Sequence, residues 1–330
     1  MSHAMRHALL WWTMLRYRVA VMLWLFLLLG TARHGGLVHL DLADLLATCA
    51  LGAAYVSATT VNDIADREID AINHPDSRGR PLVTGRASER ELYVVHGGSA
   101  VLALALAAGV GWTAVLIVLA SLLVGHAYSL PPLRLSYRTF LAPVTLAVAY
   151  VLLPYLLGVT VAGGRPGEGD RLFVAALLLL FVGRIVVKDF RDRRGDAAHG
   201  KPTLLLRFGK GSTCLVSGAA VAAGNVLLLL ALRPHPAVAT LLELFLAGVY
   251  LMLWRLWRAT SHDAEQLCIG VAAKMGNGLL ITVLGLLALA SADAAFRDQL
   301  LFGLSMAAVF GASFVVLLTR PDQAVIGYRG

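Results

Sequence analysis

Two groups of aspartates have the spacing that could bind a divalent cation. In each group the second and third aspartates follow the first by three and seven positions, and the groups lie 126 residues apart. The first aspartate cluster is Asp63, Asp66 and Asp70, preceded by Asn62, and the second aspartate cluster is Asp189, Asp192 and Asp196. On a helix these offsets share one face. Carboxylates so close repel one another unless a cation neutralises them, and Mg²⁺ takes one or two carboxylates and completes its shell with phosphate oxygens. The spacing predicts a site for a diphosphate held through Mg²⁺.

Basic residues follow both clusters in loops broken by proline and glycine. The segment HPDSRGRPLVTGR contains Arg78 and Arg80, and HGKPT contains Lys201. Between them, AYSLPPLR contains Tyr128 and Arg134. Arginine suits phosphate because its planar guanidinium donates two parallel hydrogen bonds. The alternative is that acidic helix ends are merely solvated and that single bases are topology anchors, but two clusters of identical spacing favour a diphosphate site.

The composition requires these clusters to be positioned by membrane helices. Hydrophobic residues make up 58% of the 330 residues, charged residues 15%, and the mean hydropathy is +0.74. A soluble protein carries roughly a quarter charged residues, so neither a soluble enzyme nor a disordered chain fits. The net charge of +8 reflects loops between apolar segments, and no nucleic-acid partner is expected. The isolated cysteines Cys49, Cys214 and Cys268 predict no disulfide framework.

Apolar stretches of about 20 residues predict membrane spans. Ten ranges qualify: 18–32, 42–61, 91–109, 111–128, 140–161, 172–188, 212–232, 236–257, 267–290 and 299–319. Of the 28 lysines and arginines, 22 fall at the termini and in the even-numbered loops, against five in the odd-numbered loops. This bias places both termini and both aspartate clusters on the cytoplasmic side. We expect one integral-membrane domain over 1–330, in contact with membrane lipids of a bacterial cytoplasmic membrane, with active-site loops at about 62–90 and 189–211.

Four motifs together resemble the UbiA superfamily of intramembrane prenyltransferases. They are NDxxDxxxD, SRxRPLxxG, YSxPPxR, and DxxDxxxD followed by GKxT, in that order between residue 62 and about residue 209. The resemblance implies an all-helical fold with nine transmembrane helices around a central cavity, one fewer than the ten ranges above. It also implies Mg²⁺ and a polyprenyl diphosphate donor.

Motif matching assigns a role to each candidate residue. The residues expected to hold the magnesium diphosphate are Asn62, Asp63, Asp66, Asp189 and Asp192, supported by Asp70 and Asp196. Of these, Asp63, Asp66, Asp189 and Asp192 are expected to be catalytic. The residues expected to contact the diphosphate or order the loops over it, as Asn62 would, are Arg78, Arg80, Tyr128, Arg134, Lys188 and Lys201.

The resemblance implies transfer of a prenyl group to a lipophilic or aromatic acceptor. Many family members that act on aromatic acids or quinone precursors carry an RP-type motif beside the first helix, whereas this region reads LRYRVAVML, so the acceptor stays open. Two alternatives share the motifs: a terpene cyclase that uses no acceptor, and a transferase to a sugar phosphate or glycerol phosphate. A secondary transporter is disfavoured because its polar site would lie near the membrane midplane.

Overall fold

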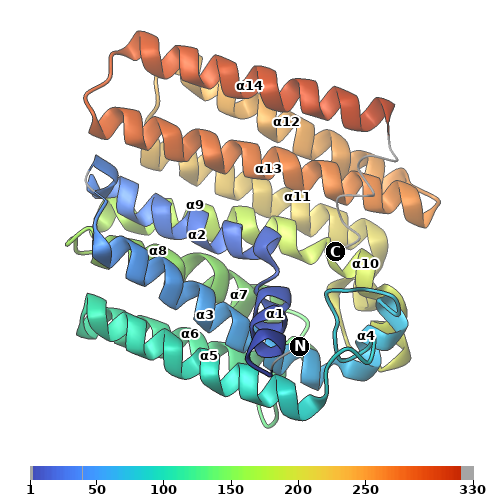
Figure 1. Cartoon of the computed structure of the whole chain (residues 1–330). Coiled ribbons are helices and arrows are strands. Elements are labelled where there is room, and N and C mark those ends of the chain that lie inside the picture. Colours follow the sequence, from blue (N-terminus) through green and yellow to red (C-terminus); the bar gives the residue numbers. More distant parts are fainter. Residues whose placement is uncertain (1–2, 39, 321–330) are drawn as a thin grey trace. The chain divides into compact units, whose positions relative to one another are not determined.

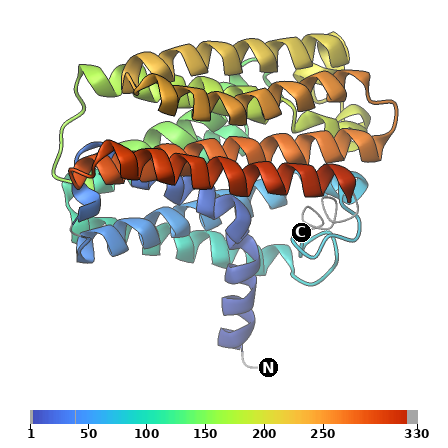
Figure 2. The ribbon, with the colours of Figure 1, turned by 90° about the horizontal axis from the view of Figure 1, so that it is seen from above.

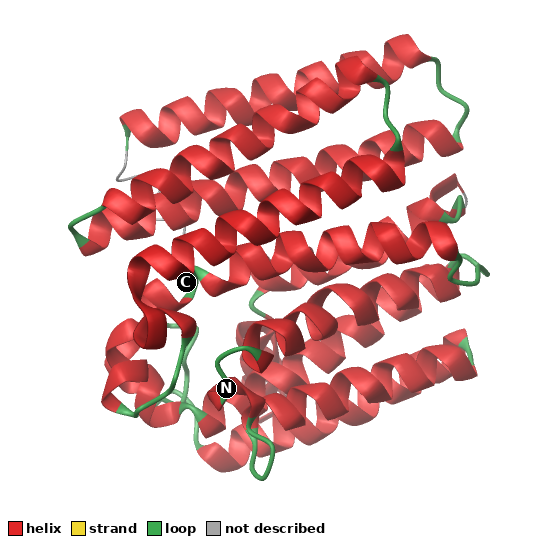
Figure 3. Cartoon of the chain, turned by 180° about the vertical axis from the view of Figure 1, so that it is seen from behind, coloured by secondary structure: helices red, strands yellow, loops and turns green. Residues whose placement is uncertain are grey.

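The computed structural model describes residues 3–38 and 40–320, which form helices and loops with no β-strand among them (Figure 3). The expected all-helical fold is confirmed. The chain divides into two compact units, one comprising Met1–Arg165 and Asp192–Thr203, the other Pro166–Arg191 and Leu204–Arg329. That residues 1–330 form a single membrane domain stays a prediction.

The first unit contains the helices that carry the first aspartate cluster (Figure 1). Its α-helices are α1 (His3–Leu15), α2 (Tyr17–Arg33), α3 (Leu42–Ala65), α4 (Arg67–Asn73), α5 (Glu89–Val110), α6 (Trp112–Ser129), α7 (Leu141–Ala147) and α8 (Leu153–Val161). The short helices η1 (Gly36–Val38), η2 (Leu135–Tyr137) and η3 (Val148–Leu152) connect them, and η3 joins α7 to α8 without a break.

Local sequence signals set the boundaries of the long helices. Asp41 caps α3, accepting hydrogen bonds from the N–H groups of Ala43 (2.7 Å) and Asp44 (3.3 Å). Ser88 and Glu91 form a reciprocal capping box at the start of α5, which satisfies N–H groups that the helix itself cannot. Gly111, at φ 144°, is the only residue between α5 and α6. Glycine adopts such a φ without strain, so a single residue can connect the two helices.

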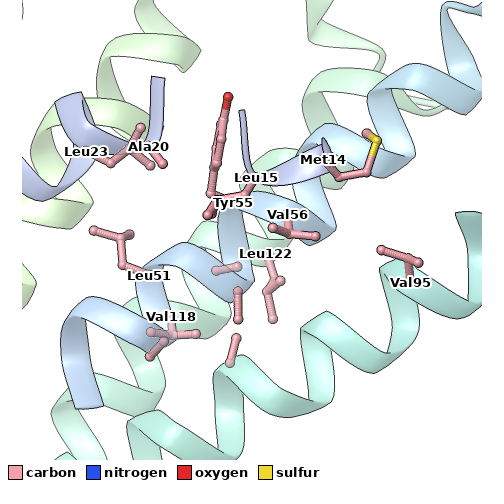
Figure 4. Packing of buried hydrophobic residues seen from close by; sticks show 14 of the residues in the cluster. Met14, Leu15, Ala20, Leu23, Leu51, Tyr55, Val56, Val95, Val118 and Leu122 are labelled. Atoms are coloured by element: carbon pink, nitrogen blue, oxygen red, sulfur yellow. The ribbon is translucent and has the colours of Figure 1, made fainter. Parts of the chain in front are cut away.

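The core of the first unit is built from small and branched side chains. Figure 4 shows α3 at the centre of this core: the Tyr55 ring points toward the residues of α1 and α2, while Val118 and Leu122 of α6 lie on the opposite side. Helix α2 packs along α8 through two glycines: a Cβ added at Gly30 would overlap the carbonyl of Tyr155, and one at Gly158 that of Leu27. Small residues let helix backbones approach closely, which stabilises helix pairs in a membrane.

Arg16 separates α1 from α2. It adopts a left-handed conformation with φ 41° and ψ 60°, and the helices on either side meet at a 63° bend. The turn of α1 away from α2 is visible in Figure 2. The bend keeps α1 from continuing α2 as one straight span.

The second unit contains α9 (Glu168–Val186), the start of α10 (Asp189–Ala198), α11 (Leu204–Leu232), α12 (Pro236–Arg258), α13 (His262–Ser291) and α14 (Phe296–Thr319). Helices α9 and α11 are joined where the Ser217 hydroxyl donates to the Gly183 carbonyl, at 2.6 Å. Helix α14 packs against α13 by aromatic rings: a Cβ at Gly278 would meet Phe310, and one at Gly285 would meet Phe302. The two glycines of α13 therefore leave room for the two phenylalanine rings of α14.

Eight helices in the described residues are long and apolar enough to cross a membrane, or nine if the bent pair Met5–Leu15 and Tyr17–Arg33 forms one span. The ten ranges expected from the sequence exceed this count by one. The expected range 172–188 does form α9, but that 19-residue helix includes Glu168, Asp170, Arg171 and Arg184, so it lacks an uninterrupted apolar length. The expected tenth range forms α14.

Candidate active site

The first aspartate cluster lies at the junction of α3 and α4. Asp66 is the residue between the two helices, with φ −103° and ψ 17°. The hydrogen-bond ladder nevertheless crosses the junction, because Asp66 N–H donates to the Asn62 carbonyl and Asp70 N–H donates to the Asp66 carbonyl, both at 2.8 Å. Asp63, Asp66 and Asp70 are all buried. The junction thus places three carboxylates in the interior of the first unit.

Part of the second aspartate cluster meets the first. The side-chain oxygen of Asn73, the last residue of α4, accepts a hydrogen bond from Gly195 N–H of α10 at 2.7 Å. A Cβ on Gly195 would lie 2.6 Å from the Asn73 side-chain nitrogen, so only glycine permits this approach. His74 Nε2 lies 3.1 Å from Asp192 Oδ1. Segments far apart in the sequence are therefore joined at α4.

Three basic side chains bind the buried carboxylates. Arg80 pairs with Asp63, and its Nη1 lies 2.8 Å from Asp70 Oδ2. The Lys201 ammonium lies 3.6 Å from Asp66 Oδ2 and 3.5 Å from Asp196 Oδ1, so it bridges the two clusters. The third base is Arg16.

Arg16 has no counterpart in the sequence prediction. Its Nη2 donates to both carboxylate oxygens of Asp63, at 2.6 and 2.7 Å, and to the Gly79 carbonyl at 3.1 Å. The left-handed conformation at the α1–α2 bend brings this side chain to the end of α3. In the sequence an arginine just before an apolar run is typical of a topology anchor, so nothing there indicated an ion pair. His74 and Asn73 were not predicted either, because neither belongs to the repeated aspartate spacing.

Other expected residues lie nearby with less direct contacts. The Asn62 side-chain nitrogen donates to Asp66 Oδ2 at 3.1 Å and to the Ser129 hydroxyl at 3.4 Å. Tyr128 precedes Ser129 on the last turn of α6. The Arg134 guanidinium stacks on the Tyr137 ring, 3.9 Å from its centroid.

Arg78, Lys188 and Asp189 differ from this group. Arg78 is exposed and, among the described residues, forms no ion pair. Lys188 and Asp189 belong to the second unit, at the end of α9 and the start of α10. Their approach to the first aspartate cluster stays a prediction.

Burial of Asp66 and Asp70 is only partly offset by their partners. It raises the pKa of Asp70 to about 6, against the opposing effect of Arg80, and the charges of Asp63 and Asp66 add to the rise. Asp66 Oδ1 is buried and accepts no hydrogen bond, and such an atom costs about 1–3 kcal/mol. A cation that binds these oxygens would stabilise the charged form of Asp70 and give Asp66 Oδ1 a partner.

The donor set fits Mg²⁺. All the candidate ligands are carboxylate or amide oxygens, which hard cations prefer. In the part of the chain that the structure describes, no three His, Cys, Asp or Glu side chains converge as a ready-made metal cage. Mg²⁺ does not need such a cage, because it binds through one or two carboxylates and takes its other ligands from water and substrate phosphates.

The chain is similar to a known protein family and to individual known proteins. A model of the UbiA prenyltransferase family matches residues 19–278, so α14 lies beyond the matched part. The bacteriochlorophyll synthase 34 kDa chain of Chloroflexus aurantiacus is 31% identical over 191 residues, which cover 57% of this chain and 60% of the relative. The chain thus spans about 60% of that relative's length.

Two solved structures share the fold. One is of a digeranylgeranylglyceryl phosphate synthase, with a TM-score of 0.63 and 19% identity, covering 86% of this chain and 99% of that one. The other is of a UbiA homologue from Archaeoglobus fulgidus bound to GPP and Mg²⁺, with a TM-score of 0.56 and 19% identity, covering 91% and 99%. At this identity the two structures establish the fold alone.

Proposed function

The chain belongs to the UbiA prenyltransferase family, and we propose from this that it is an intramembrane prenyltransferase that uses Mg²⁺ and a prenyl diphosphate donor. The observation that carries the proposal is the bridge that Lys201 makes between Asp66 and Asp196, which joins the two aspartate clusters. Support also comes from the homologue solved with GPP and Mg²⁺.

The proposed metal ligands are the aspartates of both clusters together with Asn62. When bound, Mg²⁺ supplies positive charge that stabilises a departing diphosphate. Arg80 and Lys201 are proposed to bind the diphosphate oxygens, since each already bridges two carboxylates and has donors that can turn toward an incoming anion. Once they bind the diphosphate, such donors stabilise the negative charge that develops on it during the reaction.

The proposed reaction breaks the bond between the allylic carbon and the diphosphate oxygen. A nucleophilic carbon or oxygen of the acceptor then bonds to that carbon and loses its proton, and diphosphate is released. The named relatives include a bacteriochlorophyll synthase and a digeranylgeranylglyceryl phosphate synthase. The second name describes a product that contains a glyceryl phosphate as well as geranylgeranyl groups. A product that joins prenyl groups to another molecule favours transfer to an acceptor over acceptor-free cyclisation.

The proposed location is a bacterial cytoplasmic membrane with the site facing the cytoplasm. The charge bias of the loops supports this orientation. A cysteine introduced at 74–80 or 197–201 should then react with a membrane-impermeant thiol reagent only from the cytoplasmic side. Labelling from outside intact cells would contradict the orientation.

Product analysis tests the proposed activity. Purified protein is incubated with Mg²⁺, prenyl diphosphates of graded length and a panel of lipophilic and glycerol-phosphate acceptors, and products are identified by mass spectrometry. We expect a prenylated acceptor from the wild type, a large loss with Asp66→Asn, and little change with Asp76→Asn, since Asp76 is an exposed residue of the same loop. A cyclised terpene without acceptor, or full turnover in Asp66→Asn, would contradict the proposal.

A further inference from the structure

A cavity of about 270 Å³, open to its surroundings over much of its extent, lies between α1 and α5, within the first unit. His7, Ala8 and Trp11 of α1 line it on one side, and α5 contributes Val94, Val95, Gly98, Ser99 and Leu102. No residue of either aspartate cluster lines the cavity. Its volume is near the lower limit for ligand pockets, so it has room for part of a molecule whose remainder lies in the bilayer.

Two residues that line this cavity each carry a buried hydrogen-bonding group with no partner among the described residues. The Ser99 hydroxyl is buried, with the residue 2% exposed, and forms no hydrogen bond. Several other helical hydroxyls of the chain bond to the carbonyl four residues earlier, such as Ser121 to Ile117 at 3.1 Å. Ser99 does not make this common local bond, so no hydrogen bond prevents its hydroxyl from turning toward an acceptor in the cavity.

The second group is the indole N–H of Trp11, which is buried without an acceptor. By contrast, the indole N–H of Trp24 donates to the Thr48 carbonyl at 3.0 Å. A buried donor without an acceptor costs about 1–3 kcal/mol. Two such groups on one otherwise apolar cavity indicate a ligand that brings an acceptor oxygen.

The position of the cavity indicates a membrane lipid. Beside it, α1 exposes Met5, Leu9 and Trp12, at 57, 53 and 61%, an apolar face typical of a helix lying at the lipid boundary. Along α5 the lining runs from Val94 to Leu102, and the ion pair of Arg6 with Glu91 at 2.6 Å places neighbouring His7 toward the Val94 end. Val94 and Ser99 are five residues apart, or about 7.5 Å along the helix, which suits a headgroup beside His7 and a glycerol ester further along α5.

We propose that the α1–α5 cavity binds a glycerolipid through an ester carbonyl, which accepts hydrogen bonds from Trp11 Nε1 and the Ser99 hydroxyl. The first part of the acyl chain lies along Gly98 and Leu102. This site is separate from the proposed transfer reaction and does not depend on it.

Native mass spectrometry tests the proposal, using purified protein with a phosphatidylglycerol carrying two ester-linked chains and its diether analogue. The diether has the same headgroup and chains but lacks the carbonyls. We expect wild type to bind the diester about threefold to tenfold more tightly, the range for one or more ordinary hydrogen bonds. Ser99→Ala and Trp11→Phe should each reduce this preference. Equal binding of the two lipids by wild type would overturn the proposal.

Two glycines provide a matched pair of variants. A Cβ on Gly97 or on Gly98 meets no atom within 4 Å beyond its own stretch of helix, so both positions accept a side chain without a backbone clash. Only Gly98 lines the cavity. Gly98→Leu should abolish retention of the diester lipid, while Gly97→Leu should retain it as wild type does, with similar melting temperatures for both. If Gly98→Leu retains the diester lipid as wild type does, the proposal is overturned. If prenyl transfer by Gly98→Leu is altered as well, the cavity holds a substrate and not a glycerolipid.

Discussion

The pairing of Arg16 with Asp63 predicts a measurable coupling energy in the metal-free protein. The change is a double-mutant cycle of Arg16→Gln and Asp63→Asn, each alone and combined. Asp63 is 2% exposed and Arg16 22%, so the pair is largely removed from water. Breaking one partner of a buried pair costs about 3–5 kcal/mol. Since Arg80 also pairs with Asp63, Arg16 accounts for only part of this, and we expect a coupling of about 2–3 kcal/mol.

The assay is reversible unfolding in bicelles with chelator present, which gives the free energy of unfolding of each variant. The matched control is Arg18→Gln, two residues further on, where the arginine is exposed and its Nε donates to the Tyr17 hydroxyl at 3.2 Å. Combined with Asp63→Asn, this control should be additive within about 0.5 kcal/mol. A coupling of only about 0.5 kcal/mol between Arg16 and Asp63 would refute the inference that the α1–α2 bend brings Arg16 into an ion pair with Asp63.

Three further outcomes follow from the described contacts. Arg80→Lys should lower kcat/KM for the donor about tenfold or more, as for a lost charge-assisted hydrogen bond, whereas Arg86→Lys, at an exposed position of the same loop, should leave donor kinetics unchanged. Because the folded-state pKa of Asp70 is raised to about 6 from 3.8, its contribution is most favourable below pH about 4 and is lost as the pH rises through 6. Denaturation of metal-free wild type should therefore show a loss of about 3 kcal/mol over this range, which Asp70→Asn removes; identical pH curves would contradict the shift. Gly158→Ala should destabilise the protein because its Cβ overlaps the α2 backbone, while Gly97→Ala should not; equal melting temperatures would argue against the close α2–α8 contact.

The sequence predicted the residue types at the site better than their partners. Three carboxylates on one helix face follow from a spacing of three and seven, and that pattern survives the α3–α4 break because the backbone ladder continues through Asp66. The position of Arg80 was predictable from its motif. The contribution of Arg16 was not predictable, since it depends on a left-handed backbone conformation at a helix bend. Such a conformation is rare for a residue other than glycine.

Helix boundaries show a similar contrast. The caps at Asp41 and Ser88 and the glycine at 111 are local signals, and the helices begin and end where these residues require. Membrane spans were harder to count, because hydropathy alone does not distinguish α9, which has charges near both ends, from a continuous span. Helix packing through Gly30 and Gly158 depends on which surfaces meet, and no local pattern specifies that.

The buried carboxylates of Asp63 and Asp66 differ in when their basic partners are synthesised. Arg16 precedes Asp63 by 47 residues, so Asp63 leaves the ribosome after its partner has been made. Asp66 pairs with Lys201, which is synthesised much later; at 5–20 residues per second the interval is on the order of ten seconds. During that time the nascent chain holds Asp66 without its lysine. The first unit therefore cannot complete its ion pairs until the segment around Lys201 has emerged from the ribosome.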